Sequence, residues 1–340
     1  MNLAIQMAAL ARLSSGAVRH WMQGRTPDSA YQSLVRLFCL TGGGFNDGLS
    51  RLVSMIHPPY EFDETEGVLG ALSPQDLAGV TADLDRKGYH VFARRIPEVL
   101  VERLFEFATH HPCVRRGMAQ QGVVVPTQLV ERYEREVPTA VRYDFRMQDV
   151  IDNPDVQQLM ADRSILAVAQ SYLRCKPIVD VMTMWWHTAY SKEPDKEAAQ
   201  FWHFDMDRIK WLKFFIYLTD VGPDNGPHSF VEGSHRRHGI PDALLVKGYS
   251  RLTDEEVEAC YPRERFSEFT APRGTVIAED TRGLHKGKHV ARGDRLVLQL
   301  QFSNSLFGGY YPPARFSSIG YAPLQDMLRR YPRLYRSYWN

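Results

Sequence analysis

Apolar residues recur every three or four positions in several segments before residue 175, which is the spacing of amphipathic helices. The clearest case begins at Ser73 and Pro74, two residue types preferred at helix starts. Leu77, Val80 and Leu84 then form a single apolar stripe. The pattern therefore predicts a helix that directly follows Ser73.

Further short elements are expected after this helix. The run Tyr-His-Val-Phe at 89–92 predicts a strand, and a second helix should begin at Pro97 and stop before Pro112. The segment 153–173 is expected to be mostly helical.

The pattern changes after Pro177, where segments rich in β-branched and aromatic residues are separated by clusters of turn residues. Short strands without long helices between them are typical of an antiparallel sandwich or barrel. The chain is therefore predicted to have an α+β fold, with helices first and a single β core after them. The predicted strands cover 179–188, 211–219, 275–278 and 295–302.

The first 72 residues are expected to form a helical extension. Residues 1–27 contain no acidic residue and place apolar side chains at roughly helical spacing. This composition is also found in organelle transit peptides, but we favour a helix docked on the domain. Gly42, Gly43 and Gly44 predict a turn between helices, because the segment lacks the Gly-Lys-Ser/Thr ending of a phosphate-binding loop. A linker is expected from His57 to about Gly70.

Composition excludes several classes of protein. The 340 residues carry 41 Lys and Arg against 40 Asp and Glu, so the charge excess of a dedicated nucleic-acid binder is absent. No apolar run approaches the length of about 20 residues that a membrane span needs. The four cysteines are far apart and fit a reducing compartment, so a cytoplasmic protein is expected, with organelle import as the alternative.

The sharpest candidate for chemistry is the tetrapeptide Trp-His-Phe-Asp at 202–205. Residues i and i+2 of a strand point to the same side, so His203 and Asp205 present an imidazole and a carboxylate together. One further imidazole would complete the 2-His-1-carboxylate set that holds Fe(II) and leaves positions open for substrate and O₂. Asp207 can share the same face, but we expect it in the following turn with Arg208.

Five histidines are candidates for the third ligand: His228, His235, His238, His285 and His289. We favour His285 because it follows a predicted strand and Arg295 opens the next one ten residues later. A hairpin between these strands would place His285 and Arg295 side by side. The planar guanidinium of an arginine near the metal can bind the distal carboxylate of a dicarboxylate cosubstrate.

Taken together, these motifs resemble those of the phytanoyl-CoA dioxygenase family. The resemblance covers residues 73–310 and is carried by WHFD (202–205), LKFFIYLTDV (212–221), NGP (225–227) and VEGSH (231–235). The family pattern continues with a distal histidine and an arginine, which are matched by His285 and Arg295. It departs at Glu232, where the family usually has proline, and at His228.

The resemblance implies a double-stranded β-helix, or jelly roll, flanked by N-terminal helices. It implies Fe(II) bound by His203, Asp205 and His285, with 2-oxoglutarate and O₂ as cosubstrates and Arg295 holding the distal carboxylate of 2-oxoglutarate. The expected reaction is hydroxylation of an unactivated C–H bond with release of succinate and CO₂. Because Asp205 is a carboxylate, halogenation is not expected, while desaturation and ring formation stay open.

The expected domain organisation is a helical extension at 1–72, the dioxygenase domain at 73–312 and a packed tail at 313–340. By the resemblance, His235 is not a ligand and its Gly-Ser-His turn supports the loop. Lys213 and Tyr217 share a strand face and are candidates for cosubstrate contact, and the strand 179–188 is the expected source of substrate contacts.

Two other functions stay open at this point: a zinc-dependent hydrolase on a cupin-like fold and a jelly-roll protein that binds without turnover. The first has no HExxH helix and gives Arg295 no role. The expected partner is a small, partly apolar molecule, such as a lipid-like compound or a secondary metabolite, with no nucleic acid. The oligomeric state is left open.

Overall fold

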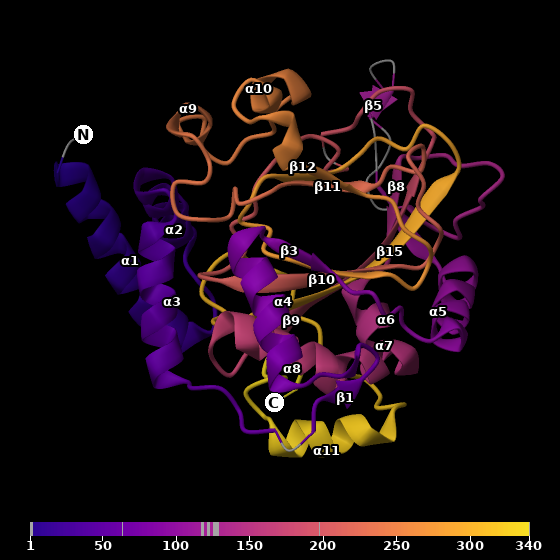
Figure 1. Cartoon of the computed structure of the whole chain (residues 1–340), viewed down its shortest axis with the longest axis horizontal. Coiled ribbons are helices and arrows are strands. Elements are labelled where there is room, and N and C mark those ends of the chain that lie inside the picture. The colour runs from indigo at the N-terminus through magenta and orange to yellow at the C-terminus, as the bar shows by residue number, and fades with distance from the viewer. Residues whose placement is uncertain are drawn as a thin grey trace.

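The computed structural model describes residues 3–62, 64–116, 119–120, 123–124, 129–196 and 198–339. Three N-terminal helices lie beside a β core, and further helices cover one side of that core (Figure 1). No helix in these ranges is long and apolar enough to cross a membrane.

The N-terminal helices are α1 (Leu3–Gln23), α2 (Asp28–Thr41) and α3 (Gly44–Ile56). Gly42 and Gly43 have φ values of 53° and 89°, which glycine adopts without strain, so the predicted turn between helices is confirmed. The apolar face of α2 is buried: Leu34 and Phe38 belong to the same hydrophobic cluster as Phe204. The N-terminal helices therefore pack directly behind the Trp-His-Phe-Asp segment.

The next segment follows the sequence prediction closely. Helix α4 (Pro74–Arg86) begins with a capping box between Ser73 and Asp76, and α5 (Glu98–His110) follows strand β3 (Tyr89–Val91). The predicted linker before α4 contains a small hairpin of β1 (Glu66–Gly67) and β2 (Gly70–Ala71).

A large antiparallel sheet has the strand order β3-β13-β10-β15-β9-β8-β4-β7. Its central strands are β10 (Trp211–Tyr217), β15 (Asp294–Ser303) and β9 (Ile178–Thr188), and β13 (Val276–Glu279) pairs with β10. The remaining strands are short: β8 (Arg142–Asp144), β4 (Cys113–Arg115) and β7 (Leu129–Glu131). Helices α6 (Met147–Asp152), α7 (Pro154–Met160), α8 (Arg163–Leu173) and α11 (Ala322–Arg330) cover its outer face (Figure 1).

A second, three-stranded sheet has the order β12-β11-β14, with β12 (Phe266–Phe269), β11 (His228–Val231) and β14 (His285–Gly287). It packs against the large sheet through Phe230 and Phe269, which share a buried cluster with Phe215, Tyr217 and Trp185. This face-to-face arrangement confirms the α+β jelly-roll fold. Short elements complete the chain: α9 (Asp242–Leu245), α10 (Asp254–Glu258), a 3₁₀ turn (Arg263–Arg265) and the pair β5 (Ala119–Gln120) and β6 (Val123–Val124).

The hairpin expected between His285 and Arg295 is wrong. His285 lies on β14 of the small sheet, whereas Arg295 lies on β15 of the large sheet. The connecting segment crosses from one sheet to the other and is held by the backbone bonds Lys288 N to Pro227 O and Ala291 N to Asp224 O. The two side chains therefore come from facing sheets.

Candidate metal centre and cosubstrate site

The two segments that carry the predicted ligands run side by side. The backbones of His203 and His285 exchange two hydrogen bonds, of 3.0 and 2.8 Å, and Asp205 N donates to Thr281 O at 2.7 Å. The Trp-His-Phe-Asp segment is extended, with bridge pairs at residues 202 and 203. Backbone pairing thus brings together His203 and His285, which are 82 positions apart in the sequence.

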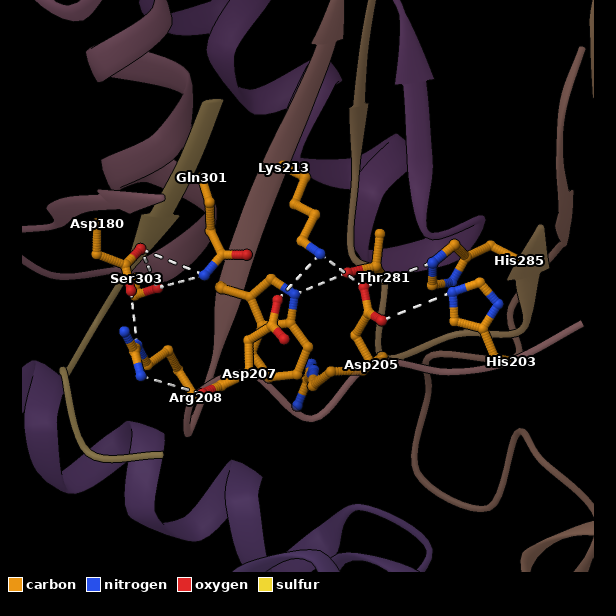
Figure 2. A network of polar contacts seen from close by, with 12 residues as sticks. Asp180, His203, Asp205, Asp207, Arg208, Lys213, Thr281, His285, Gln301 and Ser303 are labelled. Carbon is orange, nitrogen blue, oxygen red and sulfur yellow. Dashed lines mark hydrogen bonds and ion pairs between the residues drawn. The ribbon is translucent and has the colours of Figure 1, made fainter. Parts of the chain in front are cut away.

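The three side chains converge on one point. His203, Asp205 and His285 each offer a ligand atom, and these atoms lie within 4.8 Å of one another. Nε2 of His203 is 3.8 Å from Asp205 Oδ1, and Nε2 of His285 is 3.5 Å from Asp205 Oδ2 (Figure 2). All three residues are buried, so the arrangement suits a single cation held away from bulk water.

Backbone carbonyls select the tautomer of both imidazoles. Nδ1 of His203 lies 2.8 Å from Phe201 O, and Nδ1 of His285 lies 3.0 Å from Gly283 O. A carbonyl oxygen only accepts, so Nδ1 carries a proton in each ring and Nε2 is the atom that faces Asp205. This is the outer hydrogen bond expected of a metal-binding histidine, and the donor set therefore fits a divalent metal.

The charges at this point also suit a cation. Burial lowers the pKa of His203 well below its usual value, so this ring is neutral. Burial alone would raise the pKa of Asp205, but the charges of Lys213 and His285 outweigh it and hold that pKa well below its usual range. The site therefore contains an ionised carboxylate and a neutral imidazole, both in ligating form.

Lys213, on β10, binds the oxygen of the Asp205 carboxylate that also faces His285. Its Nζ atom lies 2.6 Å from Asp205 Oδ2 and 2.9 Å from Asp207 Oδ2 (Figure 2). Asp207 also faces the ring hydroxyl of Tyr311 in the C-terminal segment. Asp207 is thus paired with Lys213, and it is absent from the group of potential ligands.

The guanidinium of Arg295 is buried, and some of its hydrogen-bond donors are unused. One of its nitrogens, Nη2, contacts His187 Nδ1 at 2.8 Å, while Nε and Nη1 have no hydrogen-bond partner among the described residues. An unsatisfied buried guanidinium is costly, and a carboxylate would satisfy it. The residue present therefore fits the distal carboxylate of 2-oxoglutarate. A Cβ atom at Gly287 of the facing sheet would lie 2.8 Å from Arg295 Nη2, so the glycine leaves room for the guanidinium.

His187, on strand β9, contacts the guanidinium of Arg295. Its Nε2 lies 3.0 Å from Ala198 O, so Nε2 carries the proton and Nδ1 accepts from Arg295. Burial lowers the pKa of His187 well below its usual value, which keeps the ring neutral beside the guanidinium. His187 thus orients Arg295, a role that sequence reasoning did not assign.

The other candidate histidines lie outside the ligand group. His228 Nε2 contacts Glu279 at 3.0 Å, and burial raises the pKa of this glutamate to about 8. His235 is in the Gly-Ser-His turn, where Ser234 Oγ donates to Val231 O and accepts from Leu284 N. His238 is exposed, and His289 contacts Ser191 O.

Sequence reasoning also missed Arg251. The bridge between Trp202 and Leu252 makes Arg251 the cross-strand neighbour of His203, so both side chains are on one face. Nη1 of Arg251 is buried without a hydrogen-bond partner among the described residues. A free guanidinium nitrogen in this position can bind an anion. No motif in the loop around Arg251 indicates this position from the sequence.

Several solved structures are similar to this chain, at low sequence identity and with TM-scores below 0.5. The non-heme alpha ketoglutarate-dependent epimerase SnoN from nogalamycin biosynthesis is 16% identical, with 75% of this chain and 90% of that chain covered and a TM-score of 0.46. HygX from Streptomyces hygroscopicus with nickel and 2-oxoglutarate bound is 16% identical, with 74% and 94% covered and a TM-score of 0.49. EctD from S. alaskensis with bound Fe is 19% identical, with 75% and 85% covered and a TM-score of 0.45.

The curated proteins gave no match. The family model for phytanoyl-CoA dioxygenase matches residues 68–291, which is more than half of the chain and includes all three predicted ligands. The chain therefore belongs to the phytanoyl-CoA dioxygenase family and is a non-haem enzyme that depends on iron and 2-oxoglutarate.

Proposed function

We propose that His203, Asp205 and His285 hold Fe(II), that Arg295 holds the distal carboxylate of 2-oxoglutarate, and that the enzyme hydroxylates an unactivated C–H bond of a small molecule. The observation that carries this proposal is the pair of carbonyl-bound imidazoles, which aim both Nε2 atoms at one carboxylate. We further propose that residues 73–312 form the dioxygenase domain, with 1–72 as its helical extension and 313–340 as its packed tail.

When bound, iron and 2-oxoglutarate supply O₂ activation, with succinate and CO₂ as products. The protein's own contribution is positioning. Phe201 O and Gly283 O fix the imidazoles, and Lys213 neutralises one oxygen of Asp205 while the other faces His203. His187 orients Arg295. Burial of these groups keeps water from competing for them.

The carboxylate of Asp205 favours hydroxylation over halogenation, because it fills a position that a halide would need. It does not select between hydroxylation and other oxidations of a C–H bond, so the products of turnover decide that point. The near-neutral charge and the abundance of Trp and Tyr favour a small, partly apolar substrate.

Anaerobic titration tests the ligand set. Fe(II) with 2-oxoglutarate should give the wild-type chain a visible charge-transfer band and one bound iron. His285→Ala should lose the band and most of the iron, while His110→Ala, on the exposed end of α5, should retain both. A His285→Ala variant that binds iron and shows the band like wild type would overturn the assignment. A screen for succinate release against metabolite pools then identifies the substrate.

A further inference from the structure

A second, strongly basic pocket lies outside the proposed metal centre. It has a volume of about 460 Å³ and is formed by α3, the end of α8 and the Gly-Ser-His turn. None of the proposed metal ligands lines it. Six cationic side chains and two carboxylates contribute to its wall, although the whole chain has a net charge of only +1. The cations are Arg51, Arg174, Lys210, Arg236, Arg237 and Arg282, and the carboxylates are Asp47 and Asp85.

Lys210 is a partly buried cation that forms no ion pair among the described residues, although the charges of Asp280, Asp85 and Asp47 act on it from farther away. Its Nζ lies 3.4 Å from Tyr172 O and 4.0 Å from the centre of the Tyr172 ring, and no carboxylate of the described residues is within ion-pair distance. A buried charge without a partner is strongly unfavourable. In keeping with this, burial lowers the pKa of Lys210 to about 8. An anion in the pocket would remove this cost.

Two further groups define the inner wall. Arg282 is neutralised by Asp280 and also contacts Asp47 at 2.9 Å, so it is a fixed structural element. His235 is buried, and its Nδ1 has no hydrogen-bond partner among the described residues. Burial lowers the pKa of His235 to about 4, so this ring is neutral, and the unused cationic donor that the wall offers to an oxyanion is Lys210 Nζ.

Exposed arginines surround the opening. Arg51, Arg236 and Arg237 are exposed, and no ion pair joins them to another residue in the part of the chain that the structure describes. Arg174 pairs with Asp85 at 2.9 Å. Free guanidinium groups are the side chains best suited to bind phosphate oxygens through paired hydrogen bonds.

We propose that this pocket is a binding site for a small anion that carries a diphosphate group. One unpaired lysine and three unpaired arginines exceed what a single carboxylate can neutralise. The volume suits a small molecule, and the near-neutral chain lacks the extended basic surface of a nucleic-acid binder. Free inorganic diphosphate and the diphosphate of a nucleotide share this chemistry.

Isothermal titration calorimetry of the full chain with inorganic diphosphate tests the proposal, with a chelator present so that no metal takes part. We expect binding that weakens steeply with added salt. Lys210→Met should raise the Kd about 10- to 100-fold, because it removes one charge-assisted contact. The double variant Arg236→Gln, Arg237→Gln changes exposed side chains only, so it remains informative if Lys210→Met does not fold. The matched control is Arg19→Gln on the exposed face of α1.

The outcomes separate the possibilities. Loss of affinity in the double variant, with wild-type affinity in Arg19→Gln, supports the site. Failure of diphosphate to bind the wild-type chain, or equal affinity in all variants, overturns it. Loss of binding in Asp205→Ala instead would place the anion at the metal centre and also overturn it. ADP in place of diphosphate distinguishes the sources: tighter binding of ADP favours a nucleotide, and equal binding favours the free anion.

Discussion

The Nζ atom of Lys213 lies 2.6 Å from Oδ2 of Asp205, while Oδ1 of the same carboxylate lies 3.8 Å from Nε2 of His203. The two oxygens therefore have different surroundings: Oδ2 is bound by the ammonium and lies 3.5 Å from Nε2 of His285, whereas Oδ1 faces His203 and has no ammonium partner. This division favours a carboxylate that binds a metal through one oxygen.

Replacing Lys213 with methionine removes the cation and keeps the length of the side chain. The buried Asp205 and the partly buried Asp207 would then both lose their ammonium partner, so the metal-free chain should lose about 3–5 kcal/mol of stability. Zn(II) should raise the Tm of the variant more than that of wild type, because the metal replaces the missing charge. Denaturation with and without metal checks this, with Lys288→Met as the exposed control. Equal metal stabilisation in both chains would contradict the charge argument.

Replacing Arg295 with alanine should weaken the use of 2-oxoglutarate. The apparent KM for 2-oxoglutarate should rise by about 10- to 1,000-fold, which corresponds to a loss of about 1.4 to 4 kcal/mol. Steady-state assays of succinate over a range of 2-oxoglutarate concentrations measure this. An unchanged KM would mean that another residue binds the distal carboxylate of 2-oxoglutarate, and Arg292 would be the next candidate.

Changes at His187 should act through Arg295. His187→Leu removes the acceptor of the 2.8 Å contact and should weaken 2-oxoglutarate binding by about tenfold. His187→Asn can place an oxygen near the former Nδ1, and it should restore most of the affinity. Anaerobic titration of the charge-transfer band gives the dissociation constant directly. If the asparagine and leucine variants are equally weak, His187 does not act as the acceptor.

The buried pair of Arg208 and Asp180 should be important for stability. Nε of Arg208 lies 2.6 Å from Asp180 Oδ2, and Ser303 Oγ donates to Asp180 Oδ1 at 2.9 Å (Figure 2). Arg208→Met leaves the carboxylate buried and unpaired, which should cost about 3–5 kcal/mol in the free energy of unfolding. Urea denaturation measures this. The double variant with Asp180→Leu should recover much of the loss, and no recovery would argue against a charge effect.

Stability should fall in acid partly because of Asp280. Burial alone would raise its pKa, but the Arg282 guanidinium outweighs burial and holds the pKa well below the usual range. The unfolded chain, with a pKa of about 3.9 at this position, binds a proton first as the pH falls, so the stabilisation is present above about pH 4 and is lost below it. The free energy of unfolding of Asp280→Asn should therefore change less between pH 5 and pH 3 than that of wild type. An identical pH dependence would contradict the prediction.

Local patterns predicted the parts of the site that depend on neighbouring residues. The shared face of His203 and Asp205 follows from the two-residue period of an extended chain, and the capped start of α4 follows from Ser73. His285 is favoured because it follows a predicted strand and precedes Arg295, and the family resemblance matches the same residue. The sequence did not reveal that Arg295 is on the facing sheet, or that His187 and Arg251 lie beside the site. Those positions depend on pairing between strands that are distant along the chain, and no local pattern reports such pairing.

The packing of α2 against Phe204 has a practical consequence. The stretch that matches the family, 68–291, ends before β15 and begins after the helices that support the metal-binding segment. A fragment cut to that stretch would lack Arg295 and would expose the apolar surface around Phe204 to solvent. Functional work on this enzyme therefore requires the flanking regions, because they complete the architecture of the reaction centre.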